Sequence, residues 1–159
     1  MLCAIPNLAV VETVDSEKLA NELEKRWVAL ADERKASDPS SEGRPLTIFV
    51  QVNTSGEESK SGVEPDDAPA LAAYVAEQCP NLRVGGLMTI GMPDYTATPE
   101  NFACLKACRS AVAERLGLAD EGTLELSMGM SSDYALASEM GSTNVRVGST
   151  IFGARNYAK

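Results

Sequence analysis

Short apolar runs alternate with longer segments of mixed polarity along this chain. Five runs are rich in valine, isoleucine or leucine, and polar or glycine-containing stretches bound each of them. This pattern is typical of buried strands separated by loops and helices. The predicted strands are 8–14, 46–53, 82–90, 123–128 and 144–148.

The segments between these strands carry apolar residues three or four positions apart, which predicts amphipathic helices. The first helix follows a cap at Asp15 or Ser16. We expect the others at 66–78, at 99–116 before a closing glycine, and at 131–140. Regular alternation of strand and helix indicates an α/β fold with a parallel sheet.

The bulk properties narrow the function classes. The 159 residues suit one domain but fall short of the roughly 250 of a complete (β/α)8 barrel. A net charge of −9 argues against nucleic-acid binding, which needs Lys and Arg. No apolar run is long enough to span a membrane, and the amino-terminal stretch reads as a strand, not a signal peptide.

The chain has no histidine, so Ser-His-Asp and Cys-His mechanisms are excluded. Of its four cysteines, Cys104 and Cys108 lie four positions apart and are best read as small buried residues, and a reducing compartment fits.

Glycine-rich and polar segments follow four of the predicted strands. They read NTSGEESKSG, MTIGMPD, SMGMSSD and RVGSTIFG. Carboxyl ends of parallel strands lie at one edge of a sheet, and ligands bind there in α/β folds. The sequence therefore predicts a ligand site at this edge.

The last two of these segments are suited to an anion. Residues 131–133 lie at a predicted helix start, where free N–H groups favour phosphate, and Ser127 and Ser149 add hydroxyl donors. Either loop alone is more simply an ordinary turn. Two such loops on successive strands favour a phosphate site.

Arg146 lies inside a short strand between two valines, and its side chain points to the face opposite theirs. Two interpretations remain open. Arg146 is either a barrel-interior arginine paired with a carboxylate such as Glu125, or a cation that faces a ligand ring or anion.

Four segments together carry a specific resemblance: QVNTSGEESKSG, GLMTIG, LELSMGMSSDY and GSTNVRVGSTIFGARNY. They resemble the pyridoxal phosphate homeostasis proteins of the YggS/PROSC type, whose fold is similar to the barrel domain of alanine racemase. The resemblance implies binding of pyridoxal 5′-phosphate (PLP). It implies that Ser127, Gly148 and Ser149 hold the phosphate, that Arg146 faces the pyridine nitrogen, and that Met128 packs close to the cofactor.

The resemblance also implies a single partial barrel domain over residues 1–159. About five βα units of a (β/α)8 TIM-type barrel are expected, with the amino-terminal units missing. Those units carry the lysine that forms the PLP Schiff base, in a segment resembling AVSKTKP that does not occur here. The chain is thus expected to be the carboxyl-terminal portion of a family member. An open sheet of this kind would leave two edges and one uncovered apolar face.

The resemblance implies a non-catalytic carrier and regulator of PLP in vitamin B6 homeostasis. We expect a cytoplasmic protein, or a mitochondrial one for a longer form, whose partners are PLP and PLP-dependent apoenzymes. One alternative is a PLP-dependent amino-acid racemase-like enzyme, although Tyr95, Tyr134 and Tyr157 lie in no recognisable catalytic motif. The other alternative is a barrel fragment that binds phosphate esters without PLP.

Overall fold

The computed structural model describes residues 5, 7–37, 43–56, 61–90 and 98–153. Strands and helices alternate as predicted, with two short 3-10 turns between them. In chain order they are β1 (Val10–Val14), α1 (Glu17–Ser37), β2 (Leu46–Gln51), η2 (Pro65–Asp67), α2 (Ala68–Gln78), β3 (Leu82–Met88), α3 (Pro99–Arg115), η3 (Glu121–Thr123), β4 (Glu125–Met130), α4 (Tyr134–Glu139), β5 (Asn144–Arg146) and α5 (Ser149–Phe152).

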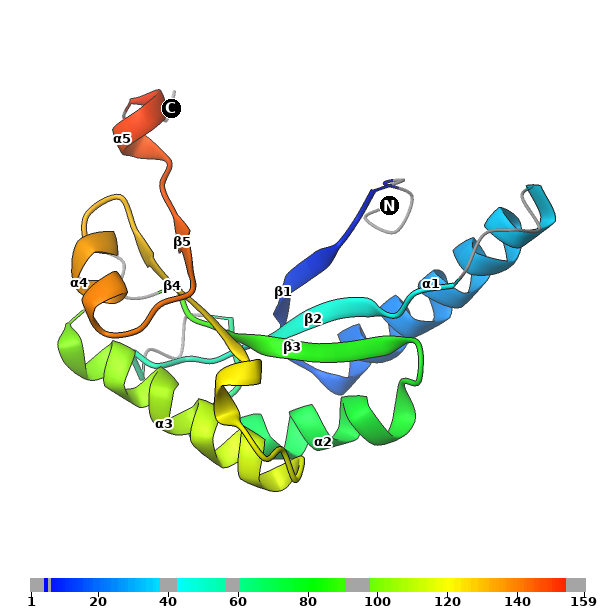
Figure 1. The fold of residues 1–159 in the computed structure, drawn as a ribbon, viewed down its shortest axis with the longest axis horizontal. Coiled ribbons are helices and arrows are strands. Elements are labelled where there is room, and N and C mark those ends of the chain that lie inside the picture. The colour runs from blue at the N-terminus through cyan, green and yellow to red at the C-terminus, as the bar shows by residue number, and fades with distance from the viewer. Residues whose placement is uncertain (1–4, 6, 38–42, 57–60, 91–97, 154–159) are drawn as a thin grey trace.

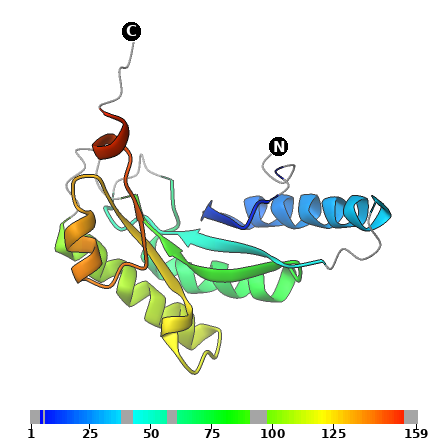
Figure 2. The same cartoon turned by 45° about the horizontal axis from the view of Figure 1, so that its top comes forward.

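The five strands form one sheet in the order β1-β2-β3-β4-β5, and all neighbouring strands are parallel. The sheet curls strongly, so that β1 and β5 rise on either side of a concave face (Figure 1). Helices α1, α2 and α3 cover the convex face, as the rotated view in Figure 2 also shows. The predicted partial TIM-type barrel is therefore confirmed.

The hydrophobic core lies between the convex face and the helices. Side chains alternate along β2, so Leu46, Ile48 and Val50 face the helices and are almost fully buried. The helix that follows β1 begins where expected, because the Ser16 hydroxyl accepts the backbone N–H of Leu19. The largest fully buried partners on the other elements are Phe102, Leu105, Leu87, Leu124 and Leu126.

The concave face differs from the uncovered apolar face that was expected. Phe49 and Met88 are buried there, but Gln51 and Thr47 share the same side of the sheet. These polar groups are paired across segments: the Gln51 amide donates to the carbonyl of residue 61, and Arg83 donates to Thr47. The described helices leave this face uncovered, as expected, but it is not apolar throughout, because interior positions of the sheet carry hydrogen-bonded polar side chains. Among the described helices, none combines the length and the apolar character that crossing a membrane requires.

The last predicted strand is shorter than expected. It ends at Arg146, and the residues from Ser149 to Phe152 form the one-turn helix α5 instead of a simple turn. Backbone N–H groups of Ile151 and Phe152 both donate to the carbonyl of Gly148. A single helical turn has no periodicity that a hydrophobic pattern could reveal.

Gly86 allows β3 and β4 to pair closely. A Cβ atom at this position would lie 2.9 Å from the carbonyl carbon of Glu125 and within contact of its oxygen. We expect Gly86→Ala to lower the free energy of unfolding by about 1–3 kcal/mol, the usual cost of overpacking. Urea unfolding measures this. Gly43→Ala is the control, because nothing lies within 4 Å of that added methyl, and equal effects of the two changes would contradict the prediction.

The cysteines of α3 differ in burial. Burial, and secondarily the neighbouring Cys104, raises the pKa of the Cys108 thiol to about 12, from an ordinary value of 9.0. The folded chain keeps a proton that the unfolded chain loses, so this group lowers stability as the pH rises from 9.0 towards about 12. Because alkylating reagents attack the thiolate, we expect the partly exposed Cys104 to be modified before Cys108 at about pH 8. Peptide mass spectrometry during a time course measures both rates, and equal rates would contradict the prediction.

Candidate functional site

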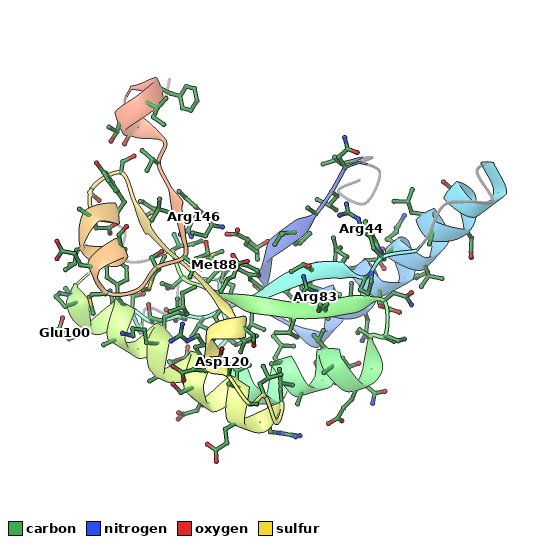
Figure 3. All side chains as sticks on the ribbon, viewed as in Figure 1. Arg44, Arg83, Met88, Glu100, Asp120 and Arg146 are labelled. Carbon is green, nitrogen blue, oxygen red and sulfur yellow. The ribbon has the colours of Figure 1, made fainter. Side chains whose placement is uncertain are left out.

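Arg146 is held at the concave side of the sheet by two hydrogen bonds. Its Nη1 donates to the Ser127 hydroxyl at 2.6 Å, and its Nη2 donates to the Thr89 carbonyl at 2.7 Å. Figure 3 places the arginine near Met88, on the inner side of the curled sheet. Residues from β5, from β4 and from the segment after β3 therefore meet at one guanidinium.

Glu12 completes this group from the opposite edge of the sheet. The Ser127 hydroxyl donates to Glu12 Oε2 at 2.6 Å, and the Asn144 amide donates to Glu12 Oε1 at 2.5 Å. Glu12 lies on β1, which pairs only with β2 among the described strands. The carboxylate thus crosses the concave side to reach β4 and β5.

Burial and the neighbouring carboxylates have opposite effects on the charge of Arg146. Burial, the largest effect, lowers the pKa of Arg146, and the nearby carboxylates of Glu12 and Asp133 act in the other direction. A guanidinium stays protonated throughout the physiological range, so Arg146 is a permanent, half-buried cation. One of the two interpretations of Arg146 paired it with a carboxylate such as Glu125. The carboxylate that it reaches, through the Ser127 hydroxyl, is Glu12, whereas Glu125 is exposed.

A second group of donors lies just beyond β5. The backbone N–H groups of Gly148 and Thr150 both donate to the Ser131 hydroxyl oxygen, at 3.0 and 3.3 Å. Asp133 instead accepts the backbone N–H of Met130 at 2.6 Å. The loop after β4 therefore supplies an oxygen acceptor to the segment after β5, and a carboxylate occupies the start of α4.

Local sequence fixes how β4 ends. Gly129 has φ +95°, and a Cβ there would lie 2.5 Å from the Cβ of Ala137. The Ser142 hydroxyl lies 2.7 Å from the carbonyl of Met128 and 3.0 Å from that of Asn144, so it ties β4 to β5. Glycine and serine at these positions let the two strands and α4 pack closely enough to bring Arg146 against Ser127.

The structure brings together some of the predicted site residues. Ser127 and Arg146 are hydrogen-bonded, and Gly148 and Ser149 follow directly at the same edge. The Met128 side chain lies in the hydrophobic core on the helix side, away from this group. Its predicted contact with a cofactor, and the predicted phosphate contact of Ser127, stay predictions.

Sequence reasoning missed Glu12, Thr89 and Asn144. A usable signal existed for Glu12, since it is the one charged residue in a valine-rich strand. Thr89 contributes its backbone carbonyl, which no sequence pattern identifies. Tyr95 and Tyr157, considered for the racemase alternative, lie outside the described residues, and Tyr134 is exposed on α4.

Residues 2–156 match the family model described as the alanine racemase N-terminal domain. This chain belongs to that family. It is 46% identical over 162 residues to the human pyridoxal phosphate homeostasis protein, covering 99% of this chain and 54% of the relative. The Vibrio cholerae protein of the same name is 40% identical, with 94% of this chain and 57% of the relative covered. The chain thus spans little more than half the length of these relatives, and the predicted resemblance is confirmed.

Several solved structures share the fold of this chain. A protein described as unknown from Bifidobacterium adolescentis superposes with a TM-score of 0.75 at 36% identity, covering 94% of this chain and 55% of that one. PipY of Synechococcus elongatus, solved with PLP bound, gives a TM-score of 0.61 at 29% identity over 94% of this chain and 63% of its own. Alanine racemase from Corynebacterium glutamicum, at 13% identity and a TM-score of 0.57, shows similarity of the fold alone.

Ser127 links the two charges of the site. We expect Ser127→Ala to lower the free energy of unfolding by about 1–3 kcal/mol, because Arg146 and Glu12 each lose a hydrogen-bond partner in a mostly buried place. Chemical denaturation measures the difference. Ser138→Ala, on the exposed side of α4, is the control and should change stability by less than about 0.5 kcal/mol. A Ser127 variant as stable as this control would show that the link contributes nothing.

Proposed function

We propose that this chain binds PLP and serves pyridoxal phosphate homeostasis without turnover. The observation that carries the proposal is the pairing of a fixed guanidinium, at Arg146, with two converging backbone N–H groups, at Gly148 and Thr150. The names of the relatives and the PLP-bound structure of PipY support the choice of ligand.

The donor set fits a phosphate ester. The two backbone N–H groups already hold one oxygen, that of Ser131, in the geometry of a shared acceptor. A phosphate oxygen that displaces the Ser131 hydroxyl meets the same two donors, and its negative charge strengthens both hydrogen bonds. The exposed Ser149 can add its hydroxyl at this edge. We assign the phosphate of PLP to Gly148 and Ser149 together with the neighbouring N–H of Thr150.

Arg146 supports binding rather than turnover. PLP supplies an electron-accepting ring, and it accepts electrons best when its ring nitrogen is protonated. We assign Arg146 to that nitrogen. A permanent cation there disfavours a second positive charge and leaves the nitrogen as an acceptor. This favours a carrier over a racemase-like enzyme, and the transfer of PLP to PLP-dependent apoenzymes is the corresponding role.

A titration with PLP tests the proposal. We expect saturable binding by the wild-type chain and a loss of at least about tenfold in affinity for Arg146→Ala, the size typical of losing a charge-assisted contact. Difference absorbance follows binding, and borohydride trapping with peptide mass spectrometry reports any lysine involved. Arg83→Ala is the matched control, because Arg83 is an exposed arginine at the far end of the same face.

Three results would contradict the proposal. The first is the absence of saturable binding, with only scattered lysine adducts that Arg146→Ala leaves unchanged. The second is saturable binding of simple phosphate esters with no preference for PLP, which would select a phosphate-ester site instead. The third is conversion of L-alanine by the chain with PLP, above the rate of free PLP, which would favour the racemase-like alternative.

A further inference from the structure

The proton of the Ser127 hydroxyl has one possible destination. Arg146 can only donate hydrogen bonds, and the Glu12 carboxylate can only accept them. The 2.6 Å contacts on both sides of Ser127 therefore run in one direction, from Arg146 to Ser127 and from Ser127 to Glu12. A serine hydroxyl has a single hydrogen, so Ser127 has none left for a phosphate oxygen.

Glu12 is fixed equally firmly. Its second oxygen accepts from the Asn144 amide at 2.5 Å, and the residue is only partly exposed on β1. Both oxygens are thus oriented by residues of β4 and β5, and Glu12 faces the guanidinium through one hydroxyl. Arg146 and Glu12 form a nearly neutral pair on the concave side.

We propose that Glu12 is a specificity-determining residue that neutralises Arg146 and holds it, through Ser127, as a donor for an uncharged acceptor. This inference rests on the proposed function and concerns the same site. An arginine without a counter-charge attracts an anionic ligand. An arginine already paired with a carboxylate favours a neutral acceptor such as a ring nitrogen. Glu12 acts through Arg146 and is a positioning residue. Ser127, which orients the guanidinium, also acts on the ligand through Arg146.

This role makes a prediction about ligand selectivity. Removing the charge of Glu12 should turn Arg146 into an anion site. Inorganic phosphate should then bind more tightly, and the preference of the site for PLP over phosphate should fall. We expect Glu12→Gln to lower the Kd for inorganic phosphate by about tenfold, the lower end of the coupling measured for close charge pairs. The Kd for PLP should not improve in parallel, so the ratio of the two constants reports specificity.

Calorimetric titrations of inorganic phosphate and of PLP, at fixed ionic strength, measure these constants. Glu125→Gln is the matched control, since it removes the same charge from an exposed position on β4. Glu12→Asp keeps the charge, so it should retain the wild-type preference against phosphate. A purely structural role for Glu12 would not predict this rescue.

Each outcome decides the inference. Tighter phosphate binding by Glu12→Gln, but not by Glu125→Gln, supports it. No gain in phosphate binding, or an equal gain in both variants, overturns it. A wild-type chain that binds no PLP refutes the proposed function, yet the phosphate comparison between the variants still tests the role of Glu12.

A folding defect in Glu12→Gln is also informative. If the uncompensated Arg146 causes the defect, the double variant Glu12→Gln with Arg146→Gln should recover most of the lost Tm. A double variant no more stable than Glu12→Gln alone would show that the two charges are not coupled, and would overturn the inference.

Discussion

A carboxylate on the first strand and a guanidinium on the last share one serine hydroxyl. Glu12, Ser127 and Arg146 come from β1, β4 and β5, and in the sheet β2 and β3 separate β1 from the other two. The link requires the sheet to curl, because only a curled sheet brings its first strand within reach of its last two. Burial penalises the charged arginine, and the facing carboxylate offsets that penalty.

The two faces of the sheet have different roles: one forms the hydrophobic core and the other carries the polar network. The convex face forms the hydrophobic core with α1, α2 and α3, and the strand side chains in that core are apolar. The concave face carries side chains that bond one another across strands. This division explains why Met128 and Ser127, neighbours in the chain, have different roles: one fills the core and the other connects charges.

The edge where the strands end combines these features into a site. Small residues after β4 and β5 let the backbone turn sharply. The N–H groups of Gly148 and Thr150 both donate to the Ser131 hydroxyl oxygen there. Arg146 lies at the end of β5, two residues before Gly148. Membership of the alanine racemase N-terminal domain family agrees with this architecture. Tightly paired polar groups on one rigid sheet are a suitable frame for holding a ligand.

The sequence by itself determined the order of strands and helices, the parallel α/β architecture, and the edge at which glycine and serine gather. Those features depend on local periodicity and on turn-forming residues, which are visible in any window of the chain. It also singled out Arg146, a charge between two valines in a strand, and Ser127, a hydroxyl donor in the segment suited to an anion. Only the tertiary structure showed that Glu12, 115 residues away from Ser127, and not Glu125, is the counter-charge. A side-chain contact between non-adjacent strands depends on the curvature of the whole sheet, which no local pattern contains.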